Sequence, residues 1–88
     1  MHEHAIVRSL MRRIEEAARA EKARRVVGIS VRLGALSHMT PGHFGEHFDH
    51  AAAGTIAEDA TLSVTTSSDI HDPRATDVVL DGIEVETD

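Results

Sequence analysis

Apolar residues recur at three- and four-residue spacing near the start of the chain, the pattern of an amphipathic helix. The spacing predicts a helix from Ala5 to about Ala23, with charged residues on its opposite face. The apolar stripe consists of Ile6, Val7, Leu10, Met11, Ile14, Ala17 and Ala18. We expect this stripe to pack on a sheet.

Apolar and polar residues then alternate from Val26 to Leu33, which predicts a β-strand with one buried face. The buried face is expected to carry Val27, Ile29, Val31 and Leu33. The other face is expected to carry Val26, Gly28, Ser30 and Arg32.

A second helix is predicted from about Pro41 to Ala53. Thr40 is a suitable N-cap, and Pro41 fits the first helical position, where no backbone donor is lost. Gly54 favours the end of the helix. The residues expected to face the core are Phe44, Phe48, Ala51 and Ala52.

Two further strands are predicted, at Thr61 to Thr66 and at Val78 to Glu86, separated by a polar loop from Ser67 to Asp77. The alternation of the last strand slips at Asp81-Gly82, as a β-bulge would produce. The order α-β-α-β-β predicts an α+β fold, a two-layer α/β sandwich. A mixed three-stranded sheet would carry both helices on one face, and its polar opposite face could receive a second copy, giving a homodimer, or a partner.

Composition narrows the function classes. The 88 residues include no cysteine, which excludes thiolate zinc sites and cysteine catalysis. The net charge of −6 argues against non-specific nucleic-acid binding. No apolar run reaches the roughly 20 residues needed to span a bilayer, and no secretory signal pattern is present. A cytoplasmic protein is expected.

The seven histidines are unusual for so short a chain. In the opening Met1-His2-Glu3-His4, an imidazole lies one residue from an α-amine. The amine, the His2 ring and one or two deprotonated backbone nitrogens would form a nitrogen-rich chelate, suited to square-planar Ni(II) or Cu(II). The same residues also fit a polar start to the helix, in which Glu3 lies near the positive end of the dipole.

A second group of histidines lies on the second predicted helix. His43, His47 and His50 occupy positions i, i+4 and i+7 beside Glu46, and two imidazoles four residues apart can share a metal ion. Together with His4 they form a candidate secondary metal site. The spacing favours a polar helix face rich in histidine over a metal site, because it indicates no fourth ligand, and the stripe could also act as a pH-sensitive surface.

Taken together, the segments resemble the HypA/HybF family of hydrogenase nickel-insertion proteins. The matching segments are Met1-His2-Glu3, Val31-Arg32-Leu33-Gly34-Ala35-Leu36-Ser37, Pro41 to Phe48, Gly54-Thr55-Ile56-Ala57-Glu58 and Ile83-Glu84-Val85-Glu86. They follow the family's order over nearly the whole chain.

The resemblance implies a metallochaperone, not an enzyme, that binds Ni(II) transiently through Met1, His2 and Glu3. It also implies delivery to the large subunit of nickel-iron hydrogenase with a maturation GTPase as partner, and a role for Glu3 in transfer. Family members carry a cysteine-based zinc ribbon between the last two strands, where this chain has only the loop 67–77. We therefore expect residues 1–88 to form one nickel-binding domain without structural zinc. The alternative is a metal-independent interaction or regulatory module on the same scaffold.

Overall fold

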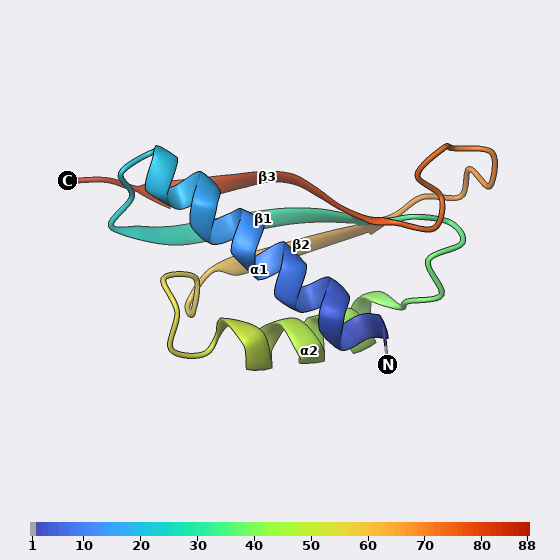
Figure 1. The fold of residues 1–88 in the computed structure, drawn as a ribbon, viewed down its shortest axis with the longest axis horizontal. Helices are drawn as coiled ribbons and strands as arrows, with labels where there is room; N and C mark the ends of the chain where they lie inside the picture. Colours follow the sequence, from blue (N-terminus) through green and yellow to red (C-terminus); the bar gives the residue numbers. More distant parts are fainter. Residues whose placement is uncertain (1) are drawn as a thin grey trace.

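The computed structural model describes residues 2–88, with side chains from His4 onward. Its elements are α1 (His2–Ala20), β1 (Arg25–Leu33), α2 (Pro41–Ala52), β2 (Thr61–Thr66) and β3 (Val78–Glu86). The sheet order is β2-β1-β3, with β1 parallel to β2 and antiparallel to β3. Both helices lie on the same face of the sheet, and α1 crosses it diagonally (Figure 1). The predicted fold class is confirmed.

Helix α1 begins and ends about three residues earlier than predicted. Its end has the hydrogen bonds of a Schellman motif: the Ala23 N–H donates to Ala18 O at 2.9 Å, and the Lys22 N–H donates to Arg19 O at 3.0 Å. Lys22 takes the left-handed conformation this motif requires, with φ of 54°. The helix therefore stops at Ala20 although helix-forming residues follow it.

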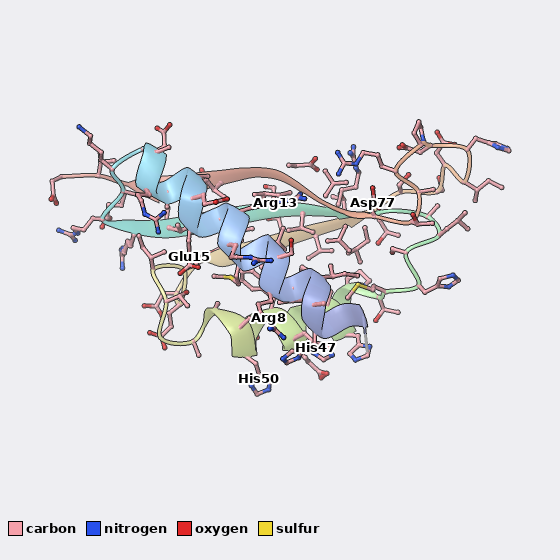
Figure 2. All side chains as sticks on the ribbon, in the orientation of Figure 1. Arg8, Arg13, Glu15, His47, His50 and Asp77 are labelled. Carbon is pink, nitrogen blue, oxygen red and sulfur yellow. The ribbon has the colours of Figure 1, made fainter. Side chains whose placement is uncertain are left out.

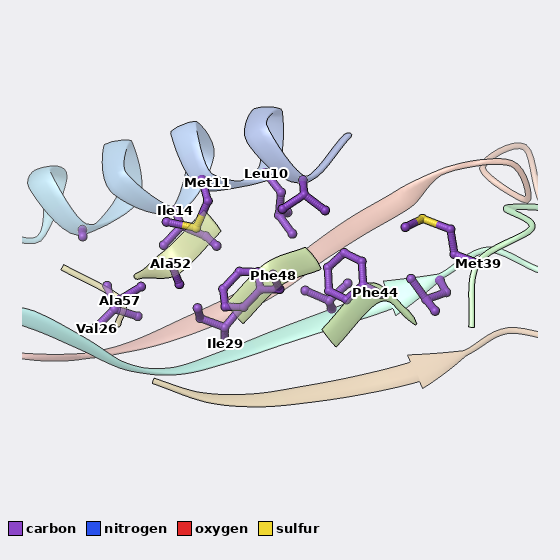
Figure 3. Close-up of a cluster of buried hydrophobic side chains, with 14 residues drawn as sticks. Leu10, Met11, Ile14, Val26, Ile29, Met39, Phe44, Phe48, Ala52 and Ala57 are labelled. Atoms are coloured by element: carbon purple, nitrogen blue, oxygen red, sulfur yellow. The ribbon is translucent and has the colours of Figure 1, made fainter. Parts of the chain in front are cut away.

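The core lies between the helices and the inner face of the sheet (Figure 3). Phe44 and Phe48 of α2 stack with ring centroids 6.1 Å apart, and both are almost fully buried. The stripe predicted for α1 supplies buried residues at Val7, Leu10, Met11, Ile14 and Ala18. An aliphatic core around two phenylalanines therefore fixes α1 across α2.

One prediction for β1 is wrong at its beginning. Val26 is buried and Val27 is half-buried, the reverse of the expected phase, whereas Ile29, Val31 and Leu33 are buried as predicted. The pairing with β3 passes from Val26 to Gly28, so Val27 is an extra residue on β1. Such a bulge shifts the side-chain alternation by one residue.

The bulge predicted in β3 is confirmed. Ser30 pairs with Gly82 and Val31 pairs with Leu80, so Asp81 has no partner in the register. The outer face of the sheet is polar, with Ser30, Ser63 and Thr65 exposed. Within the described residues, neither helix is long and apolar enough to cross a bilayer.

The loop 67–77 is ordered by its own short-range hydrogen bonds. The Asp69 side chain accepts from the His71 N–H at 2.9 Å, and the Asp72 side chain accepts from the Arg74 N–H at 2.8 Å. The Leu36 N–H donates to Ala75 O at 2.7 Å, which ties the loop to the connection after β1. The loop therefore folds back on the sheet end through buried Ala75.

The core analysis predicts that Ile14→Ala lowers the free energy of unfolding by about 2–5 kcal/mol, because it leaves a cavity at a fully buried position. The control is Ile70→Ala, since Ile70 is 56% exposed and its truncation should cost less than about 0.5 kcal/mol. Urea denaturation followed by circular dichroism measures both. Equal losses in the two variants would contradict the assigned core.

The tie between the loop and β1 predicts a second effect on stability. A Cβ at Gly34 would collide with the Ala75 carbonyl and lie 2.7 Å from Arg74 O, so Gly34→Ala should cost about 1–3 kcal/mol. Gly45→Ala, in α2, meets no atom within 4 Å and should instead stabilise the protein by up to about 1 kcal/mol. Thermal denaturation distinguishes the two signs, and stabilisation by Gly34→Ala would refute the close approach.

Candidate metal-binding site

His2 and Glu3 lie at the start of α1. The first N–H groups of a helix have no acceptor within the helix, so the backbone nitrogens near His2 are not committed to helical hydrogen bonds. Met1, and the side chains of His2 and Glu3, lie outside the described residues. The predicted ligand set at Met1, His2 and Glu3 therefore stays a prediction.

The first turns of α1 lie beside α2 (Figure 1). The ring of His4 contacts the ring of His47 edge-to-face, with centroids 6.4 Å apart. This contact joins residues that are 43 positions apart in the sequence (47 − 4). The contact therefore places the first turn of α1 beside the histidine stripe of α2.

Among the imidazole pairs found in contact within the described part of the chain, His43 and His47 are the closest. Their Nε2 atoms are 3.1 Å apart, and their ring centroids are 4.8 Å apart. The backbone that carries them is held by the N-cap, because Thr40 Oγ1 accepts from the His43 N–H at 3.2 Å. The i, i+4 spacing thus places both rings on one side of α2.

The other two histidines of the predicted secondary site are less closely associated. His4 reaches His47 but is not part of the Nε2 pair, and His50 lies one turn further along α2 (Figure 2), where it lines the groove between the helices. Among residues whose side chains are described, no group of three or more His, Asp or Glu could hold a metal ion. The described residues therefore supply at most two ligands to one metal ion.

A groove runs between α1 and α2 next to these histidines. His4, His47 and His50 line it together with Arg8, Arg12 and Glu15. A shallower hollow on the outer side of α2 is lined by His43, Glu46, His47, Asp49 and His50. The two carboxylates make this hollow more favourable to a cation than the arginine-lined groove.

Imidazoles from two helices thus lie together beside the first turn of α1. Residues 1–71 match the model of the family described as hydrogenase/urease nickel incorporation, metallochaperone, HypA. The chain belongs to this HypA family, which the sequence resemblance predicted. The family is described as one of metallochaperones for nickel incorporation.

Two curated relatives illustrate the similarity. A hydrogenase maturation factor HypA from Picosynechococcus is 36% identical over 66 residues, which cover 75% of this chain and 58% of the relative. A hydrogenase maturation factor HypA from Aquifex aeolicus is 40% identical over 62 residues, covering 70% and 54%. This chain thus spans a little over half the length of the curated relatives it matches.

Solved structures agree on the fold. The solution structure of the Ni metallochaperone HypA from Helicobacter pylori superposes with a TM-score of 0.80 at 17% identity, covering 98% of each chain. A second HypA solution structure gives a TM-score of 0.76 at 20% identity, covering 100% of this chain and 98% of the other. At this identity the likeness establishes the arrangement of helices and strands.

Sequence analysis grouped His4 with the histidines of α2, but no spacing along the chain indicated that His4 contacts His47. The spacing within α2 indicated the His43–His47 pair, but the approach of α1 depends on how the two helices cross. Only the diagonal placement of α1 over α2 brings His4 there (Figure 1).

The N-cap analysis predicts that Thr40→Ala lowers the free energy of unfolding by about 0.5–2 kcal/mol, because the His43 N–H loses its acceptor. Thr40→Ser keeps a hydroxyl and should retain most of this stability. Chemical denaturation of both variants measures the difference. A Ser variant as unstable as the Ala variant would show that the hydroxyl is not the stabilising group.

Proposed function

We propose that this protein binds Ni(II) as cargo at its N-terminus and assists its delivery during maturation of nickel-iron hydrogenase. The Met1 amine, the His2 imidazole and the backbone nitrogens of His2 and Glu3 supply the ligands. The single observation that carries the proposal is the family match over residues 1–71, which includes this tripeptide. The location of His2 in the first turn of α1 supports it.

The proposed ligand set has a clear chemical preference. Four nitrogen donors from one short stretch of chain favour a square-planar d⁸ or d⁹ ion, which describes Ni(II) and Cu(II). A free α-amine is required, so acetylation or a leading tag would remove one donor. Because affinity alone favours copper, nickel would be selected by supply and by the partner protein.

The wider biological setting follows from the relatives. The curated relatives are named as hydrogenase maturation factors. We therefore propose a hydrogenase maturation GTPase and the hydrogenase large subunit as partners, in the cytoplasm. We also propose that residues 1–88 act as one nickel-binding domain, in which the self-bonded loop 67–77 replaces a zinc ribbon and no structural zinc is bound.

A second candidate function uses the open face of the sheet. The exposed residues Ser30, Ser63 and Thr65 form a polar surface that the helices leave uncovered. An interaction or regulatory module would use this surface without metal, and a second copy of the chain could dock on it as well. Calorimetry with a maturation GTPase, with and without nickel, separates metal-dependent from metal-independent binding.

The nickel proposal predicts that the untagged protein shows the absorption of a square-planar nitrogen site, and that this signal saturates at about one Ni(II). His2→Ala should abolish this absorption because the imidazole ligand is lost, and an N-terminal tag should have the same effect. His71→Ala is the matched control, since His71 is an exposed histidine in the loop 67–77. Ultraviolet-visible titration measures all four proteins.

Two results would refute the proposal. One is the absence of a saturable square-planar signal in the untagged protein. The other is an unchanged signal in His2→Ala.

A further inference from the structure

The His43–His47 pair has the separation of two ligands on one ion. Two imidazole nitrogens bound at about 2.0–2.1 Å lie about 2.9 Å apart at a right angle and about 3.4 Å apart at the tetrahedral angle. The observed Nε2–Nε2 distance of 3.1 Å falls between these values. We propose that His43 and His47 bind a divalent first-row transition metal ion through both Nε2 atoms, at a second site on α2.

The pair can accept an ion without a change in its total protonation. The Nε2–Nε2 hydrogen bond requires one ring to carry a hydrogen on Nε2 and the other to accept it, and the tautomers decide which ring does so. When the donor ring moves this proton from Nε2 to Nδ1, both Nε2 lone pairs face the space between the rings. The ion then takes the place of the shared proton, and each ring remains neutral.

The backbone beneath the pair is held in place. Phe44 and Phe48, which follow the two histidines in sequence, are 0% and 2% exposed and anchor α2 to the core. The Thr40 cap fixes the turn that carries His43. Two rings held one turn apart lose little freedom on binding, which favours chelation by both.

The surroundings of the pair favour a cation and give it access. His43 is exposed and His47 is half-buried, so water can reach the ion and fill its remaining positions. Glu46 and Asp49 line the same hollow and add negative charge. The site is therefore an open, histidine-based site of modest affinity.

This second ion is distinct from the proposed N-terminal cargo. The proposed amine, imidazole and two backbone nitrogens fill all four positions of a square plane, which leaves none for His43 or His47. Two imidazoles with water instead favour a six-coordinate, paramagnetic Ni(II), whereas square-planar Ni(II) is diamagnetic. The inference rests on the α2 geometry and not on the proposed function, and magnetism separates the two sites.

The test uses the untagged full chain and Ni(II) alone. The variants are His2→Ala, His43→Ala/His47→Ala and the triple combination, studied by calorimetry and by paramagnetic broadening of histidine ring signals in proton NMR. His2→Ala should still bind about one Ni(II) and broaden the His43 and His47 signals. The triple variant should lose this binding by at least about tenfold, since even outer-shell changes cost metal sites about 10–100-fold.

Two controls keep the assignment specific. His71→Ala in the His2→Ala background should bind Ni(II) as before, because His71 is an exposed histidine of the loop 67–77 and does not line the hollow that holds the pair. Circular dichroism checks that each variant is folded. The inference is overturned if His2→Ala binds no Ni(II), if its binding survives in the triple variant, or if His71→Ala weakens it as much as His43→Ala/His47→Ala.

The two proposals fail separately. A diamagnetic, square-planar signal that persists in His43→Ala/His47→Ala supports the N-terminal site regardless of the α2 pair. A paramagnetic ion in His2→Ala supports the α2 pair regardless of the N-terminal site.

Discussion

The burial of the apolar stripe of α1 against α2 and the sheet is the interaction on which the rest of this structure depends. The stripe residues Leu10, Met11 and Ile14 are in the same buried cluster as Phe44 and Phe48. Each fully buried aliphatic side chain contributes about 1.5–3 kcal/mol through the hydrophobic effect. That stabilisation fixes α1 in direction as well as in position, and so determines where the N-terminal residues lie.

The fold also brings together charged residues that are unevenly distributed along the sequence. Eight of the nine basic residues lie between Arg8 and Arg32, and the chain from Glu46 onward is strongly acidic. In the fold, β1 lies beside β3, and both Arg24 and Arg25 contact Glu86 at 3.1 Å. These pairs are exposed and individually weak. Their effect is to bring the two oppositely charged halves of the sequence together at one end of the sheet.

Much of the fold could be predicted from local patterns. The periods of 3.6 and 2.0 residues identified both helices and all three strands, and the slip at Asp81-Gly82 identified a bulge. The bulge at Val27 was missed because its neighbours, Val26 and Gly28, are not polar and give no sign of which face they occupy. The end of α1 was placed too late because Lys22 adopts a conformation usually reserved for glycine.

The candidate site was predictable only in part, for a related reason. Spacing along one helix determines that His43 and His47 share a face, but the distance between helices depends on packing far from these residues. The contact of His4 with His47 is therefore a property of the core, not of any motif.

The pairing of β1 with β3 also affects how the protein can be made. Arg25 pairs with Glu86. The central strand β1 is complete at Leu33, but its neighbour β3 is complete only after more than fifty further residues have been added (86 − 33). Contacts this distant in sequence slow folding because a long loop must close first. During synthesis, α1 emerges long before the complete surface it covers exists. Its apolar stripe is exposed in that interval, when chaperones or premature partners could reach it.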